Sequence, residues 1–441
     1  MDDSFDPQAL FRQGQMYARR GEFLKAIDSI TLAIEQDAFR PEYFFERGNC
    51  FTAIEELSDA IADYGVALDI DPEFAAAWHN RGTARADFGE LQDAVADYDK
   101  AIRLTPDDPD PYNGRGVALA RMDDTEAALE DFCKALELDP SSTRILFNRA
   151  NAYTALERHQ EAIEDYNAAI KRSPFHARSY LYRGTSWLAL GKHGKAIDDF
   201  STVLRMEGTN AEAFYQRGRT HLDQRDFDAA FADLNRAVKL APSHASSWNL
   251  RGVVLAQSGK HEAALQDFNK AIELDPELVS AHFNRGLAHF QHKNWPAALA
   301  DFTATIELDP RHAPAWNLRA SVHLQQGDKL ATIADHARGL EINPDDALAH
   351  NHLAWISATA PEAELRDGRQ AVEHARRACE LTGWKVAGFL DTLAAALAEN
   401  GDFDEAVRYQ QEAIHLVSEP ERPEYQSRLD LYRGGKPFRD V

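Results

Sequence analysis

Small and large apolar residues recur at helical spacing within each stretch of 34 residues along most of the chain. In the segment 75–108, residues four apart define one helix face: Trp78, Gly82 and Ala86. Gly89 then interrupts the helical pattern. A second face follows, formed by Ala94, Tyr98 and Ala101. Pro106 ends it, because a proline disfavours helical geometry in the residue before it. Each period therefore predicts two antiparallel helices.

Three residue types keep this period over many cycles. The prolines stand 34 residues or a multiple of 34 apart: Pro72, Pro106, Pro140, Pro174, Pro242, Pro276, Pro310 and Pro344. An arginine followed by Gly or Ala keeps the same spacing: Arg47, Arg81, Arg115, Arg149, Arg183, Arg217, Arg251, Arg285 and Arg319. So does an alanine: Ala26, Ala60, Ala94, Ala128, Ala162, Ala196, Ala230, Ala264 and Ala298. One hairpin cannot bury both of its faces, so successive hairpins must stack.

This pattern resembles the tetratricopeptide repeat (TPR) family, which carries a large residue at repeat position 4, Gly or Ala at 8, Ala at 20, an aromatic residue at 24, Ala at 27 and Pro at 32. We count twelve repeats, which start at residues 7, 41, 75, 109, 143, 177, 211, 245, 279, 313, 347 and 387. The resemblance implies an all-α fold: a right-handed superhelical solenoid of about twelve TPR helical hairpins with a C-terminal capping helix.

The expected organisation follows from the repeat count. Residues 1–6 form an N-terminal extension and 7–346 form repeats 1–10. Residues 347–420 form the divergent repeats 11 and 12, with an inserted loop at 358–368. Residues 421–441 form a capping helix and tail, because a terminal repeat would otherwise leave an apolar face in water. The stretch 347–441 also resembles the ending of a group of bacterial TPR proteins, which implies a lineage and not a function.

Arginine at position 7 and aspartate at position 23 occur together in repeats 2–10, and both are missing from repeats 1, 11 and 12. The aspartates are Asp63, Asp97, Asp131, Asp165, Asp199, Asp233, Asp267, Asp301 and Asp335. We predict a ladder of Arg–Asp pairs that ties the two helices together, within a repeat or across a repeat junction. The alternative is two independently solvated charges, which would contribute little stability.

Composition narrows the classes of partner. The formal net charge is −24, which disfavours nucleic acids and anionic membranes. The first residues are acidic and lack an apolar signal sequence, and no run approaches the ~18 apolar residues of a spanning helix. We therefore expect a cytoplasmic protein. Cys50, Cys133 and Cys379 lie far apart and form no metal-binding or redox motif, so we expect reduced thiols.

The sequence contains no catalytic constellation, and we expect no enzyme activity, cofactor or metal ion. The segment 261–265 has leucine where the HExxH zinc motif needs its second histidine. His289 and His292 lie three residues apart and could share a metal. However, His282 and His350 hold repeat position 4, which is normally a packing position, and equivalent positions of neighbouring helices lie ~10 Å apart.

The resemblance implies that positions 2, 5, 6, 9, 12 and 13 line an inner surface. A clamp for chaperone C-termini would need lysine at position 5, which never occurs here. Basic, amide and tyrosine side chains instead gather on the inner positions of repeats 4–7: Arg121, Arg144, Asn148, Asn151, Arg178, Tyr182, Tyr215 and Arg219. Asparagine can pair with a peptide backbone and arginine with carboxylates. We hypothesise that an acidic extended segment binds there. The alternative is that these arginines pair locally with nearby carboxylates.

The sequence therefore favours a protein–protein interaction scaffold or adaptor that binds a partner protein or extended peptide. An obligate structural subunit of a larger complex is the alternative. A co-chaperone or a regulatory subunit of an enzyme is a further alternative.

Overall fold

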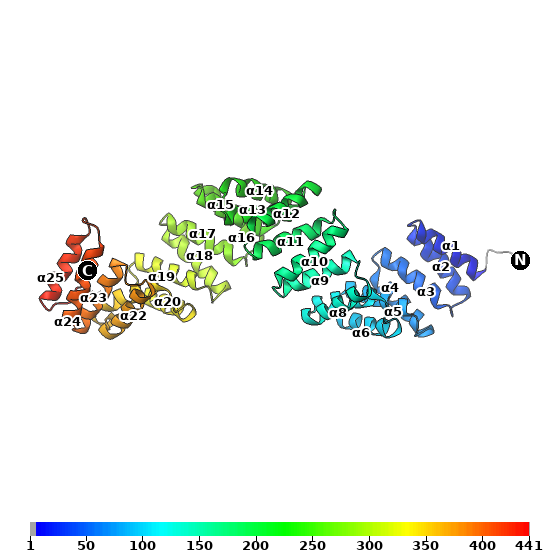
Figure 1. The fold of residues 1–441 in the computed structure, drawn as a ribbon, viewed down its shortest axis with the longest axis horizontal. Coiled ribbons are helices and arrows are strands. Elements are labelled where there is room, and N and C mark those ends of the chain that lie inside the picture. Colours follow the sequence, from blue (N-terminus) through cyan, green and yellow to red (C-terminus); the bar gives the residue numbers. More distant parts are fainter. Residues whose placement is uncertain (1–5, 441) are drawn as a thin grey trace. The chain divides into compact units, whose positions relative to one another are not determined.

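The structure, a computed structural model, describes residues 6–440. Their regular elements are the α-helices α1 to α25 and one 3-10 helix, η2, and no strand occurs among them. Successive helices pack as hairpins, as Figure 1 shows, so the all-α prediction is confirmed. Of the expected N-terminal extension only Asp6 is described. Its side chain accepts a hydrogen bond from the backbone N–H of Gln8 and caps α1.

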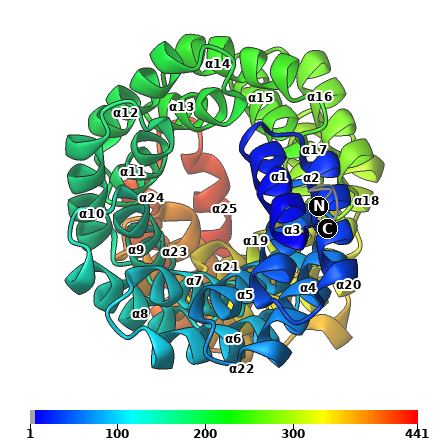
Figure 2. The same cartoon turned by 90° about the vertical axis from the view of Figure 1, so that its right-hand side faces the viewer.

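Two compact units make up the chain, Met1–Gln224 and Arg225–Val441, which we call unit 1 and unit 2. Unit 1 holds α1 (Pro7–Arg19), α2 (Phe23–Gln36), α3 (Pro41–Ala53), α4 (Leu57–Ile70), α5 (Ala75–Phe88), α6 (Leu91–Leu104), α7 (Pro109–Arg121), α8 (Thr125–Leu138), α9 (Thr143–Ala155), α10 (His159–Arg172), α11 (Ala177–Ala189), α12 (His193–Met206) and α13 (Ala211–Asp223). Within this unit, Figure 2 shows α7, α9 and α11 on the inner side and α8, α10 and α12 on the outer side.

Unit 2 continues the same pattern and ends in a single helix. It holds α14 (Phe227–Leu240), α15 (Ala245–Gln257), α16 (His261–Leu274), α17 (Val279–Gln291), α18 (Trp295–Leu308), α19 (Ala313–Gln325), α20 (Lys329–Ile342), α21 (Ala347–Thr359), η2 (Ala363–Leu365), α22 (Gly368–Leu381), α23 (Ala387–Asn400), α24 (Phe403–Leu416) and α25 (Arg422–Arg433). None of the described helices in either unit is both long and apolar enough to cross a membrane.

The turn inside each hairpin other than α21–α22 is short, because one residue in it takes a left-handed backbone conformation. Gly89, between α5 and α6, has φ of 103°, which glycine adopts without a steric penalty. Asp123 has φ of 62° at the same repeat position, between α7 and α8. Aspartate tolerates this conformation better than most residues. The helix break predicted at Gly89 is therefore confirmed.

Small residues let the paired helices approach closely around one aromatic ring. A Cβ atom added to Gly116 of α7 would lie 2.8 Å from Cε1 of Phe132 in α8. Ala128 and Ala135 flank Phe132 on α8 and are fully buried. Real Cβ atoms do not approach so closely, so the ring of Phe132 requires glycine at position 116, whereas Ala150 and Ala320 hold the same repeat position in repeats 5 and 10.

Eight of the nine predicted Arg–Asp pairs form within their own repeat. Arg149 of α9 shows the pattern: its Nε and Nη2 donate to Oδ2 and Oδ1 of Asp165 in α10 at 2.7 and 2.8 Å. The other seven pairs are Arg47–Asp63, Arg81–Asp97, Arg115–Asp131, Arg183–Asp199, Arg251–Asp267, Arg285–Asp301 and Arg319–Asp335. All eight aspartates are buried, so the prediction of independently solvated charges is wrong for these pairs. Of the ninth predicted pair, Arg217 belongs to unit 1 and Asp233 to unit 2.

The third nitrogen of most of these arginines also reaches the preceding repeat. Nη1 of Arg47 donates to the hydroxyl of Thr31 in α2 at 2.9 Å, and Nη1 of Arg251 donates to Oδ1 of Asn235 in α14 at 2.8 Å. The acceptor always lies sixteen residues before the arginine, as the aspartate lies sixteen after it. The guanidinium therefore links three helices. The predicted Arg–Asp pairing forms within the repeat, and the contact across the junction goes to acceptors other than the predicted aspartates.

Repeat 11 departs from the pattern where the loop was predicted. α21 ends at Thr359 and α22 begins at Gly368, with η2 between them. Arg366 anchors this segment through Nε, which lies 3.0 Å from Oε1 of Glu399 in α23. The helix α25 lies within residues 421–441, where the sequence predicts a capping helix and tail.

Candidate functional site

The eight predicted site residues lie on α7, α9, α11 and α13, the first helices of four successive repeats in unit 1. Three of these helices, α7, α9 and α11, form the inner side of the unit in Figure 2. Arg144 and Asn148 are one helical turn apart on α9, as are Arg178 and Tyr182 on α11 and Tyr215 and Arg219 on α13. Arg144 and Asn148 hold repeat positions 2 and 6, as do Arg178 and Tyr182, whereas Tyr215 and Arg219 hold positions 5 and 9.

Three of the predicted residues line one groove of about 250 Å³ between α7 and α9: Arg121, Asn148 and Asn151. Its remaining lining comes from Val117, Ala120, Thr125, Phe132, Ala152 and Ala155. The groove thus combines five apolar side chains with four polar ones, Arg121, Thr125, Asn148 and Asn151. This composition is typical of a site that holds an apolar group and orients it by a few hydrogen bonds.

Hydrogen bonds fix the two asparagines in the groove. Nδ2 of Asn148 donates to Oδ1 of Asn113 in α7 at 2.9 Å, and the buried hydroxyl of Tyr166 donates to Oδ1 of Asn151 at 2.6 Å. Asn148 therefore keeps its carbonyl oxygen, and Asn151 its two N–H groups, for a further partner. Arg121 donates through Nη1 to the backbone carbonyl of Ala86 in α5 at 2.6 Å.

The other arginines differ in their surroundings. Arg144 forms an ion pair with Asp110 of α7, and their side chains are 60% and 52% exposed. Local pairing, the alternative to a ligand site, therefore occurs at this position. Arg178 and Arg219 are exposed, and no carboxylate of the described residues lies within ion-pair distance of either. These two guanidinium groups are the ones that an acidic partner would meet without displacing a carboxylate.

The two tyrosines are held differently. The ring of Tyr182 is 41% exposed and stands edge-on to Phe147 of α9, with centroids 5.6 Å apart. Tyr215 is half-buried, and burial raises the pKa of its phenol although Arg219 opposes the shift. A phenol whose pKa is raised is neutral at physiological pH, so Tyr215 acts as a hydrogen-bonding rather than a charged group.

Sequence reasoning missed Asn113, which positions Asn148. The signal was present: an asparagine at repeat position 5 is followed 35 residues later by one at position 6, and the same spacing recurs at Asn249 and Asn284. Nδ2 of Asn284 donates to Oδ1 of Asn249 at 3.0 Å, as in the α7–α9 pair. Asparagine pairs between successive first helices are therefore a recurrent device of this chain.

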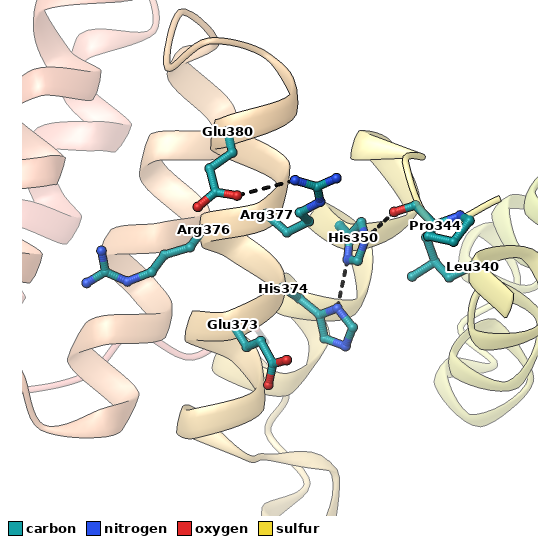
Figure 3. Close-up of a pocket in the computed structure, with 8 residues that line it drawn as sticks. All are labelled: Leu340, Pro344, His350, Glu373, His374, Arg376, Arg377 and Glu380. Carbon is teal, nitrogen blue, oxygen red and sulfur yellow. Dashed lines mark hydrogen bonds and ion pairs between the residues drawn. The ribbon is translucent and has the colours of Figure 1, made fainter.

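Unit 2 contains a larger groove, of about 560 Å³, that the sequence did not indicate (Figure 3). It is lined by Leu340, Pro344, His350, Glu373, His374, Arg376, Arg377 and Glu380. Nδ1 of His350 lies 2.8 Å from Nδ1 of His374, and Nε2 of His350 lies 3.0 Å from the carbonyl oxygen of Pro344. A carbonyl only accepts, so Nε2 of His350 carries its proton and His374 donates to Nδ1 of His350.

These contacts explain most of the histidines noted in the sequence. His350 and His282 use Nε2 to bind the proline carbonyl that ends the preceding repeat, as the indole of Trp78 does at the same repeat position. Position 4 is thus a packing position for them, as predicted. Across residues 6–440, no group of three or more His, Cys, Asp or Glu side chains is arranged to hold a metal ion.

Family profiles match well over half of the chain. Profiles described as tetratricopeptide repeats match residues 113–175, 155–211, 215–279, 283–347 and 386–417, and one described as a TPR repeat matches 84–123. The chain belongs to the tetratricopeptide repeat family. The predicted resemblance is confirmed, and the TPR fold is generally a non-catalytic scaffold for protein–protein interaction; none of the matched profiles describes an enzyme.

Several solved TPR structures resemble parts of the chain. A TPR protein from Parabacteroides merdae ATCC 43184 is 20% identical over 56% of this chain and 98% of its own, with a TM-score of 0.46. YrrB, described as a TPR protein with an unusual peptide-binding site, is 26% identical over 42% of this chain and 95% of its own, with a TM-score of 0.36. A chain of the APC/C hetero-tetramer Cut9–Hcn1 is 14% identical over 90% of this chain and 91% of its own, with a TM-score of 0.47. No curated protein matches the sequence.

Proposed function

We propose that this TPR chain is a scaffold or adaptor that binds an extended, acidic segment of a partner protein along α7, α9, α11 and α13. The observation that carries the proposal is the groove between α7 and α9, whose lining combines an apolar surface with Arg121, Asn148 and Asn151. Such a surface binds a partner through one inserted apolar side chain and hydrogen bonds to the adjoining backbone.

The spacing of the helices suits an extended chain. Neighbouring first helices lie ~10 Å apart, and an extended peptide rises ~3.3 Å per residue, so about three residues pass each helix. A segment with an apolar residue in the α7–α9 groove would bring acidic residues to Arg178 and Arg219 at intervals of about three residues. The bound segment would thereby place its charges beside two exposed arginines that have no carboxylate partner among the described residues.

Arg144 should contribute less than Arg178. The guanidinium of Arg144 is already paired with Asp110, so an acidic partner gains that contact only by displacing the aspartate. This difference gives the proposal an internal control that simple charge counting does not offer.

The experiment begins with a library of displayed twelve-residue peptides selected on the purified chain, followed by fluorescence anisotropy on the selected peptides. We expect selected sequences rich in Asp and Glu, and a loss of affinity of tenfold or more for Arg178→Glu or Arg219→Glu. Arg144→Glu should weaken binding less, and Arg103→Glu, an exposed position on α6, should leave it unchanged. Equal affinity of all four variants would contradict the proposal.

A second candidate is an obligate subunit of a larger complex. Phe39 and Phe175, in the loops before α3 and α11, are 84% and 87% exposed and would be covered by another subunit. Sedimentation of the purified chain separates the two functions, because an obligate subunit should self-associate through these rings and the Phe39→Ser, Phe175→Ser variant should not.

A further inference from the structure

The segment that follows the capping helix lies against the inner repeat positions of unit 2. After α25, Gly435 takes a left-handed backbone with φ of 65°, and the chain turns back towards α21. Residues 436–440, which we call the tail segment, then contact Trp355, Ala358 and Thr359. These three residues hold positions 9, 12 and 13 of repeat 11. The same positions line the inner surface in repeats 4–7.

Each side chain of the tail's last three described residues has a partner. The ring of Phe438 packs on Trp355 of α21, with centroids 5.9 Å apart. Nη2 of Arg439 lies 2.6 Å from Oε2 of Glu399 at the end of α23. Oδ2 of Asp440 accepts a hydrogen bond from the indole Nε1 of Trp355 at 2.7 Å.

The tail backbone is bound as well. The N–H of Asp440 donates to the carbonyl oxygen of Thr359 at 2.9 Å. Thr359 is the last residue of α21, where helix carbonyls have no partner within the helix. The inserted segment after α21 leaves this helix end open to the tail, and its own Arg366 binds the same Glu399. Repeats 11 and 12 therefore present a ring, an indole donor, a carboxylate and a backbone acceptor together.

We propose that this face of α21 and α23 is a second peptide-binding site, specific for an extended segment with an aromatic residue, an arginine and an acidic residue in succession, and that the chain's own tail occupies it until a partner segment replaces it. Specificity follows from the order of the contacts along the bound segment. An aromatic ring packs on Trp355, the next residue's guanidinium pairs with Glu399, and the following carboxylate accepts from the indole N–H of Trp355. The site lies in unit 2 and does not depend on the groove between α7 and α9.

Tethering explains why the site is filled in the free protein. An attached segment has an effective concentration in the millimolar range, so it outcompetes a dilute peptide of equal intrinsic affinity. The contacts nevertheless come from only three side chains and one backbone hydrogen bond, so local opening of the tail requires little free energy. A partner with additional contacts elsewhere on the protein would displace the tail.

The test uses the full chain and a labelled, C-terminally amidated peptide with the sequence of residues 434–440, followed by fluorescence anisotropy. We expect the peptide to bind the Phe438→Ala, Arg439→Glu chain at least tenfold more tightly than the wild type, because that chain's own tail is detached. Adding Glu399→Arg to this variant should abolish binding, and a peptide carrying glutamate in place of its arginine should then bind instead. Lys436→Glu, an exposed tail position, is the matched control and should behave as the wild type.

A second measurement needs no labelled peptide. Trypsin cleaves after Arg439, so cleavage there should be slow in the wild type and at least tenfold faster in Phe438→Ala or Trp355→Ala. The proposal is overturned if the tail-detached chain, with an unchanged circular dichroism spectrum, binds the peptide no better than the wild type. It is also overturned if the wild type forms a dimer that Arg439→Glu dissociates, because the occupant would then be the tail of a second copy.

Discussion

Replacing Asp165 by asparagine removes the charge from one step of the Arg–Asp ladder. The side chains of Arg149 and Asp165 are 23% and 8% exposed, and two hydrogen bonds join them. Removing one member of a fully buried ion pair costs about 3–5 kcal/mol, because the other charge loses its partner in a poorly solvated place. Arg149 stays partly hydrated and asparagine still accepts one hydrogen bond, so we expect about 2–3 kcal/mol here.

The matched control is Asp110→Asn. Asp110 also pairs with an arginine, Arg144, but both side chains are more than half exposed. Exposed pairs contribute about 0–1 kcal/mol, since water and salt screen them. The two variants make the same chemical change in neighbouring repeats, and they differ in burial.

Native-state hydrogen exchange is the suitable assay, because a repeat array need not unfold as one unit. A loss of 2–3 kcal/mol should speed exchange of the α9 and α10 amides about 30- to 140-fold in Asp165→Asn. Asp110→Asn should change exchange about fivefold or less. The Arg149→Met, Asp165→Leu double variant should recover part of the loss, since no charge is left unpaired. Equal exchange in Asp165→Asn and Asp110→Asn would refute the assignment of the ladder as a structural tie.

Three further predictions concern packing, pH and thiol chemistry. Gly368→Ala should destabilise unit 2 by about 1–3 kcal/mol in urea unfolding, because the added Cβ would lie 2.7 Å from the backbone nitrogen of Asn400. The control is Gly194→Ala, whose Cβ would meet nothing within 4 Å and which should stabilise α12 by about 0.5–1 kcal/mol. Burial and a neighbouring histidine lower the pKa of His336 to about 4, below its value of ~6.5 in the unfolded chain, so stability should be full above pH 6.5 and fall as the pH drops towards 4. We expect a loss of about 2 kcal/mol between pH 7 and pH 5, which His336→Phe should abolish in urea titrations at the two pH values. Burial raises the pKa of Cys379 to about 12, so alkylation at pH 8 should proceed only through local unfolding and should be accelerated by urea well below the unfolding midpoint.

The repeat fold could be predicted from the sequence because its constraints recur. Gly116 and its equivalents are small wherever a ring faces them, and Asp165 and its equivalents are acidic wherever an arginine faces them. The hydrogen bond from Nη1 of most ladder arginines to the preceding repeat could not be predicted, because its acceptor varies in residue type. Thr31 and Asn235 are polar and Cys133 is not, yet all three accept from an arginine of the next repeat, Cys133 with its sulfur 3.6 Å from Nη1 of Arg149.

The candidate site was predicted in part. The inner positions were identified by their place in the repeat, and Arg121, Asn148 and Asn151 do line one groove. The pairing of Arg144 with Asp110 depends on side-chain reach across two helices, which repeat position alone does not give. Contacts of the tail were not predicted either, since a five-residue segment after two glycines has no periodicity to read.

The partners of the ladder arginines lie at the same sequence distance before and after them, and this equal spacing affects how the chain can gain or lose repeats. Each arginine of the eight pairs has its aspartate sixteen residues ahead, and all but Arg81 also bind a partner sixteen residues behind. Deleting or duplicating one whole 34-residue period between repeats 2 and 10 brings a new arginine to the same two kinds of partner, so the seam closes without a compensating substitution. Unequal recombination within the gene could therefore lengthen or shorten the regular part of the array while the divergent last two repeats and their tail stay intact.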